Sequence, residues 1–212
     1  MPYTNQFVNV IPFGVNIDDF CNKEVDTLFD KNAFVVGCIK SLEKIYNIDV
    51  LIKAFASLII RYPSSQFKLL IIGVGSQEFF FKKMVSDLSL KDDVLFTGRI
   101  PFSEVSNYFN MLDVLVNISD YESFGVSVIE AMACEKPVIA TNTGGLKEII
   151  ENMQSGKMVM FLYQGWEAEN YTISHWEDDK YKTFYHMVED VLQQYGLPYN
   201  SIVILNSNVK LH

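Results

Sequence analysis

A regular alternation of two kinds of segment between residues 34 and 161 constrains the fold more than any other feature of this sequence. Short runs rich in β-branched residues alternate with segments whose apolar residues recur every three or four positions, the spacing of one helix face. We expect strands at Phe34–Ile39, Phe67–Ile72, Val94–Thr97, Val114–Ile118, Val138–Thr141 and Met158–Phe161. We expect helices at Ile48–Arg61, Phe79–Leu88, Val105–Leu112, Val126–Cys134 and Leu146–Ile150.

The expected strands are apolar on both faces, which is typical of a parallel sheet covered by helices on both sides. With right-handed crossovers, this pattern predicts an α/β fold with a doubly wound, Rossmann-like sheet. The alternation stops after Phe161, where the sequence indicates only a helix at Lys180–Tyr195 and an extended run at Ser201–Leu205.

Charge and cysteine content exclude several classes of protein. The 212 residues carry a formal net charge of −9, which would repel nucleic acid and anionic membranes. Cys21, Cys38 and Cys134 lack zinc-ligand or redox spacing and are expected to be reduced thiols. Neither a signal peptide nor an apolar stretch long enough to span a bilayer is visible, so the sequence predicts a cytoplasmic protein.

Ligands of an open parallel sheet bind beyond the carboxyl ends of the strands. One of the loops there begins Gly73-Val74-Gly75, which is similar to the start of a dinucleotide fingerprint. The third glycine is missing, because position 78 is Glu78, and the aromatic run Phe79–Phe81 that follows indicates core packing. This departure disfavours a nicotinamide- or flavin-dependent dehydrogenase.

The most informative stretch runs from Ser119 to Cys134 and reads as a loop followed by a helix. Phe124-Gly125 would let the backbone approach a ligand, and free N–H groups at a helix start favour an anion such as phosphate. Glu122 precedes this helix and Glu130 lies about one turn inside it. Each carboxylate could accept hydrogen bonds from two sugar hydroxyls. Alternatively, Glu122 is a solvated loop residue and Glu130 an exposed helix residue.

The spacing of Glu122 and Glu130 resembles the E-x7-E signature of the family-4 (group 1) retaining glycosyltransferases. Other segments resemble the same family in order, which makes the likeness specific. They are Val10–Asn16, Leu70–Gly75, Val94–Pro101, Pro137–Thr141 and Thr143–Ile149. The resemblance implies the donor-binding half of a two-domain GT-B architecture. It divides the chain into an opening segment from the interdomain hinge (1–33), a nucleotide-sugar-binding domain (34–163) and an unmatched tail (164–212).

The resemblance also implies roles for residues. Glu130 would bind the ribose and Glu122 the transferred sugar, while the diphosphate would lie over the start of the helix at Val126. The remaining positions implied for donor binding are Phe124, Gly125, Gly73, Gly98, Arg99, Gly144 and Gly145. The donor would be a nucleotide-diphosphate sugar such as a UDP- or GDP-sugar. Neither a cofactor nor a bound metal is expected, because basic side chains and helix N-termini stabilise the leaving diphosphate.

Three departures from the family pattern qualify these expectations. Cys38 stands where the family commonly has an arginine, so Lys40 and Lys44 are the candidates to contact the diphosphate. Alternatively, both are solvated surface lysines. We expect the acceptor domain to be missing, and with it the sugar- or lipid-linked acceptor's site and any peripheral association with a membrane. The histidines His175, His186 and His212 lie in the unmatched tail, and the irregular spacing around His175 favours a solvated cluster over a metal site.

Two functions remain open. The chain is either the donor domain of a glycosyltransferase in polysaccharide or glycoconjugate synthesis, or a non-catalytic module that binds a nucleotide or nucleotide-sugar.

Overall fold

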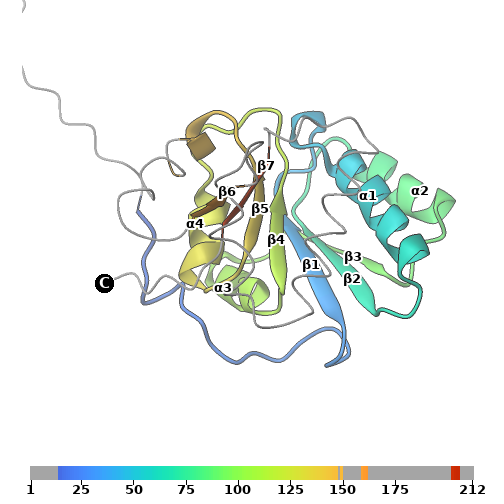
Figure 1. Cartoon of the computed structure of the whole chain (residues 1–212), viewed down its shortest axis with the longest axis horizontal. Helices are drawn as coiled ribbons and strands as arrows, with labels where there is room; N and C mark the ends of the chain where they lie inside the picture. The colour runs from blue at the N-terminus through green and yellow to red at the C-terminus, as the bar shows by residue number, and fades with distance from the viewer. Residues whose placement is uncertain (1–13, 148, 150–158, 162–201, 206–212) are drawn as a thin grey trace, which may run out of the picture.

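The computed structural model describes residues 14–147, 149, 159–161 and 202–205. Strands and helices alternate along the chain, as Figure 1 shows. The elements are β1 (Phe34–Ile39), the 3-10 helix η1 (Lys44–Tyr46), α1 (Ile48–Arg61), β2 (Phe67–Ile72), α2 (Glu78–Asp87), β3 (Val94–Gly98), α3 (Phe102–Asn110), β4 (Val114–Asn117), α4 (Val126–Ala133), β5 (Val138–Thr141), β6 (Val159–Phe161) and β7 (Ile202–Leu205). Residues 145–147 and 149 are also helical.

Five strands form a parallel sheet in the order β3-β2-β1-β4-β5. The chain winds outward from β1 to β3 and then crosses to β4 on the other side of β1. This reversal of strand order is the hallmark of a doubly wound sheet, so the predicted fold class is confirmed. It also makes β1 and β4 central neighbours, and their carboxyl ends therefore meet at one edge of the sheet.

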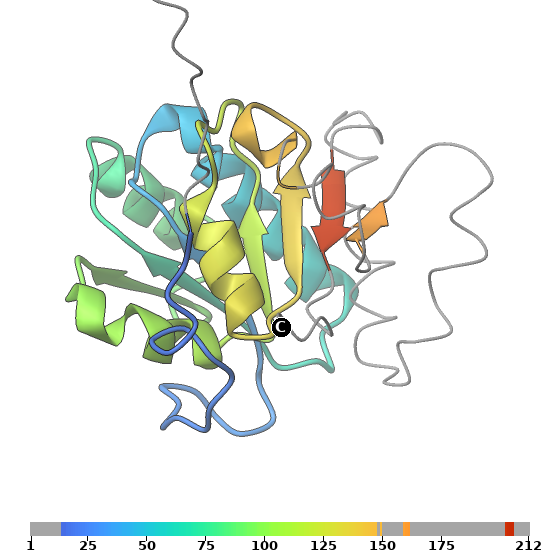
Figure 2. The same cartoon turned by 90° about the vertical axis from the view of Figure 1, so that its left-hand side faces the viewer.

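Helices cover both faces of the sheet, and each face has its own apolar core. The helices α1 and α2 lie over one face, and α3 and α4 lie over the other (Figures 1 and 2). Successive side chains of β1 alternate between the two cores: Val36 and Cys38 pack toward α1 and α2, and Val35 packs toward α3 and α4. This alternation explains why the strands are apolar on both faces.

Two details differ from the sequence-based expectation. The outer edge of β5 does not pair with β6, because β7 lies between them and is antiparallel to both. The aromatic run of α2 is not packed as a unit. Phe81 is buried, whereas Phe79 is 82% and Phe80 is 49% exposed, because Phe81 and Val85 form the face that points to the core.

The described part of the opening segment runs along the side of α3 and α4 (Figure 2). Phe20 is buried and packs its ring edge against Phe109 at a centroid distance of 6.1 Å. The backbone N–H of Lys23 donates to Asn110 Oδ1 over 3.1 Å. The expected domain boundaries at residues 33 and 163 remain predictions. The residues 10–13, the helix at Lys180–Tyr195 and the three histidines lie outside the described residues.

Candidate functional site

The loops expected to hold the site meet at the carboxyl edge of the sheet. The structure joins the loop after β1 to the loop after β4 through a salt bridge between Lys40 Nζ and Glu122 Oε2. Both side chains are largely buried, with 12% and 10% of their surfaces exposed. The alternative interpretation of Glu122 as a solvated loop residue is therefore wrong, and the same holds for Lys40 as a solvated lysine.

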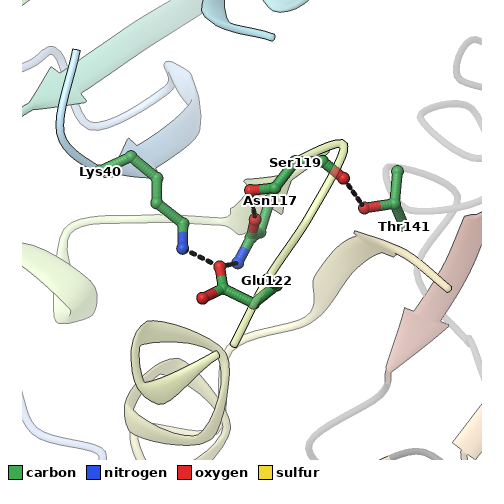
Figure 3. Close-up of polar contacts among 5 residues, drawn as sticks. All are labelled: Lys40, Asn117, Ser119, Glu122 and Thr141. Atoms are coloured by element: carbon green, nitrogen blue, oxygen red, sulfur yellow. Dashed lines mark hydrogen bonds and ion pairs between the residues drawn. The ribbon is translucent and has the colours of Figure 1, made fainter. Parts of the chain in front are cut away.

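A chain of buried polar groups supports Glu122 (Figure 3). Asn117 Nδ2 donates to Glu122 Oε2 over 3.4 Å, and the Ser119 hydroxyl donates to Asn117 Oδ1 over 2.7 Å. The Thr141 hydroxyl in turn donates to the backbone oxygen of Ser119 over 2.6 Å. Sequence reasoning did not single out Asn117 or Thr141. Their one visible signal is a polar residue at the end of an otherwise apolar strand.

The helix α4 begins directly beside this carboxylate. Gly125 caps it with a φ of 91°, a left-handed conformation that favours glycine. In the described part of the chain, the backbone N–H groups of Gly125, Val126 and Ser127 have no acceptor. Three donors at a helix start that are unsatisfied among the described residues form an environment suited to a phosphate.

Glu130 lies on the same helix and is also buried, with 9% of its surface exposed. The alternative interpretation of Glu130 as an exposed helix residue is therefore wrong. Burial raises the pKa of Glu130 from its ordinary value of 4.5 to about 7. Its carboxylate has no hydrogen-bond or ion-pair partner among the described residues, so its acceptor capacity is available to a ligand.

Two of the predicted glycines bring the loops into contact. A Cβ at Gly73 would overlap the backbone oxygen of Lys40, and a Cβ at Gly144 would overlap that of Glu122. The backbone N–H of Gly145 also donates to the Glu122 oxygen over 2.7 Å. These glycines thus allow close packing of the loops that carry Lys40 and Glu122.

A second set of contacts holds η1 against the loop after β4. Asn47 Nδ2 donates to Asp120 Oδ1 over 2.6 Å and to the backbone oxygen of Ile118 over 3.0 Å. Thr143 Oγ1 donates to the backbone oxygen of Asp120 over 2.9 Å. Asp120 therefore connects the segment carrying Lys44 to the loops carrying Glu122 and Gly144.

Lys44 and Arg99 are placed differently from Lys40. Both side chains are exposed, and neither has a polar partner within the ranges that the structure describes. Gly98 has a φ of 73°, with no atom within 4 Å of the position that a Cβ would occupy. The structure leaves the predicted roles of these three residues untested.

Cys38 is fully buried and is no substitute for the arginine that it replaces. Burial raises the pKa of its thiol to about 12, so the side chain is a neutral packing group. The described cysteines are all free thiols.

The described residues contain no cluster of three or more His, Cys, Asp or Glu side chains suited to a metal ion. Within the same residues, none of the helices is long and apolar enough to cross a membrane.

Comparison with known proteins identifies the family of the chain. Residues 20–180 match the family described as glycosyl transferases group 1. A D-inositol 3-phosphate glycosyltransferase of Pseudarthrobacter chlorophenolicus is 31% identical over 159 residues, which are 72% of this chain and 38% of that protein. The chain belongs to the group 1 glycosyl transferases.

Solved structures agree on the fold. The Anabaena protein HepE, crystallised with UDP and glucose, aligns with 26% identity and a TM-score of 0.56, covering 65% of this chain and 39% of HepE. The C-terminal domain of a Francisella tularensis glycosyl transferase group 1 protein aligns with 22% identity and a TM-score of 0.59, covering 85% of this chain and 97% of that domain. The chain therefore has the fold of a C-terminal domain of this family, and it spans about two-fifths of the length of the curated relative above.

Proposed function

We propose that this chain is the donor domain of a retaining glycosyltransferase. It binds a nucleotide-diphosphate sugar for transfer to an acceptor in polysaccharide or glycoconjugate synthesis. The observation that carries the proposal is the arrangement around the start of α4. The buried carboxylates Glu122 and Glu130 lie there with three backbone N–H groups that have no acceptor among the described residues. The complex of the related HepE with UDP and glucose adds support.

In this arrangement each group meets the part of the donor that suits its chemistry. Glu130 accepts hydrogen bonds from the ribose hydroxyls, which replace the water that burial removes. Glu122 accepts a hydroxyl of the sugar. The N–H groups of Val126 and Ser127 point at the diphosphate, and Lys44 supplies a positive charge from the exposed side.

Lys44 and the helix start stabilise the diphosphate as it departs, so the reaction requires no bound metal ion. The acceptor attacks from the face that the diphosphate leaves, and a phosphate oxygen takes the acceptor's proton. Glu122 positions the sugar in this reaction and does not act as a nucleophile. The acceptor, whether a sugar or lipid-linked, is bound by a second domain.

Calorimetric titration of the 212-residue chain with UDP, GDP and ADP, and then with their sugar conjugates, tests this proposal. We expect one nucleotide to bind, and its sugar conjugate to bind more tightly. Titration in EDTA and in Mg²⁺ should give the same affinity. Absence of binding by all of these ligands would contradict the proposal, and binding of the nucleotide without any gain from the sugar would favour the non-catalytic module.

Two variants assign the parts of the site. Glu130→Ala is expected to weaken nucleotide binding by about tenfold or more, because the ribose hydroxyls lose a charged acceptor. Glu122→Gln is expected to leave the affinity for the nucleotide nearly unchanged and to reduce the affinity for its sugar conjugate. Glu104→Ala is a matched control, since Glu104 is an exposed carboxylate on α3. Equal, negligible effects at positions 122 and 130 would refute the assignment.

A further inference from the structure

The salt bridge between Lys40 and Glu122 is unusual in this domain because it is buried. The other described ion pairs each have side chains that are 24% to 61% exposed: Lys53–Asp49, Lys68–Asp93, Lys82–Glu78 and Lys83–Asp87. Exposed pairs of this kind contribute little to stability. A buried pair is costly to break, because removal of one partner leaves the other charge uncompensated.

The contacts of Glu122 divide its two oxygens. Oε2 accepts from Lys40 Nζ and from Asn117 Nδ2, and Oε1 has no partner among the described residues (Figure 3). The orientation of the Asn117 amide is fixed, because the Ser119 hydroxyl donates to its oxygen and so turns its NH₂ group toward Glu122. Oε2 of Glu122 is thus occupied by hydrogen bonds within the protein, and Oε1 is available to accept a hydrogen bond from a ligand.

Lys40 is equally constrained. Its ammonium group bonds to Glu122 Oε2 and lies 5.0 Å from the centroid of the Tyr46 ring. Lys44, in the same loop, is exposed and has no partner within the described part of the chain. The two lysines that the sequence offers as candidates to contact the diphosphate therefore have different environments.

We propose that Lys40 is a positioning residue for Glu122 and not a ligand of the diphosphate. It holds Oε2 so that Oε1 alone faces the donor and accepts a hydroxyl of the sugar. The inference rests on the proposed function and deepens it, because it makes sugar recognition depend on a single oriented acceptor. Lys44 is then the cation of this loop that contacts the phosphates.

A double-mutant cycle separates positioning from direct contact. In Glu122→Gln the amide oxygen turns to Lys40, and an NH₂ group replaces the acceptor that faces the sugar. The gain in affinity of UDP-glucose over UDP should then fall about tenfold. Lys40→Met should lose at least as much, because Glu122 is left as an unpaired buried anion beside the diphosphate.

The decisive comparison is Lys40→Met made in the Glu122→Gln chain. If Lys40 acts through Glu122, the double variant binds UDP and UDP-glucose within about twofold of Glu122→Gln alone. A further loss of about tenfold in UDP binding would mean that Lys40 contacts the phosphates, and it would overturn the inference while leaving the proposed function intact. Lys68→Met is a matched control, because Lys68 forms a half-buried pair with Asp93 at the opposite edge of the sheet.

Melting temperatures without ligand provide a second readout. They are measured on the unaltered chain, on Glu122→Gln, on Lys40→Met and on the double variant. Lys40→Met should lower the melting temperature strongly in the unaltered chain and much less in the Glu122→Gln chain. Equal decreases in both would show that the two residues are not coupled and would overturn the inference. Failure of the unaltered chain to bind UDP, GDP, ADP or any sugar conjugate would overturn the proposed function, and this inference with it.

Discussion

At the scale of single residues, Glu130 has the most informative environment. Its carboxylate is buried on α4 with no partner among the described residues, and its pKa is raised to about 7 by that burial. An ionised carboxylate is therefore less favourable in the folded chain than in the unfolded chain. A residue that lowers the stability of the free domain in this way is readily explained if a ligand supplies the missing hydrogen bonds.

This environment makes stability depend on pH. Because the pKa of Glu130 is higher in the folded state, its contribution favours folding below pH 4.5 and is lost as the pH rises through about 7. Glu130→Gln should abolish this loss and should increase the free energy of unfolding at pH 8 by about 1–2 kcal/mol, after allowance for partial solvation. Urea unfolding of both chains between pH 5 and pH 8 measures the difference. A constant difference across this range would contradict the assignment.

The sequence predicts a site at Glu122 and Glu130, but it does not predict the buried environment of either carboxylate. The spacing of Glu122 and Glu130 indicates a sugar site, yet exposure was an equally acceptable interpretation until the fold was known. The pairing of Lys40 with Glu122 depends on β1 and β4 being neighbours, which links residues 82 positions apart. The exposure of Phe79 likewise depends on the exact rotation of α2, which the run of three aromatic residues does not determine.

At the scale of elements, the site consists of short loops packed directly against one another. Gly144 illustrates the requirement: its φ is 53°, and a Cβ there would overlap the backbone oxygen of Glu122. The loop after β5 thus supports the loop that carries Glu122. Any side chain at this position must move one of the two loops.

Gly144→Ala should therefore be more destabilising than backbone strain alone explains. Gly98→Ala is a matched control, because Gly98 has a φ of 73° and free space around its Cβ position. We expect Gly98→Ala to lower the free energy of unfolding by about 1 kcal/mol and Gly144→Ala to lower it by at least about 1 kcal/mol more. Thermal unfolding of the two variants measures this, and equal losses would show that the loops are not in contact.

The elements themselves were largely predictable because apolar runs and helical periodicity are local properties. The bounds of β1, β2, β5 and α1 agree with the sequence-based expectation. The position of β7 was not predictable, since an extended run can add to any free sheet edge in either direction. Pairing of Ile202–Leu205 with β5 is a long-range choice that local patterns do not encode.

At the scale of the whole molecule, the doubly wound sheet gathers residues from distant parts of the chain at one edge. Lys40, Glu122 and Gly144 belong to three loops, and Asp120 links two of these loops to η1. A donor bound there would contact the loops after β1, β4 and β5, which are neighbouring strands of the sheet. Its binding should therefore stabilise the domain as a unit.

We expect the nucleotide selected by titration to raise the stability of the 212-residue chain by about 2.7 kcal/mol at a concentration of one hundred times its Kd. The same concentration should stabilise Glu130→Ala much less, because its Kd is higher. Hydrogen exchange locates the effect, and protection should increase in residues 38–46 and 119–128. The turns at residues 62–66 and 88–93, at the opposite edge of the sheet, are the internal control. Protection confined to those turns would place the ligand away from the proposed site, whereas protection of both central loops would place it across β1 and β4.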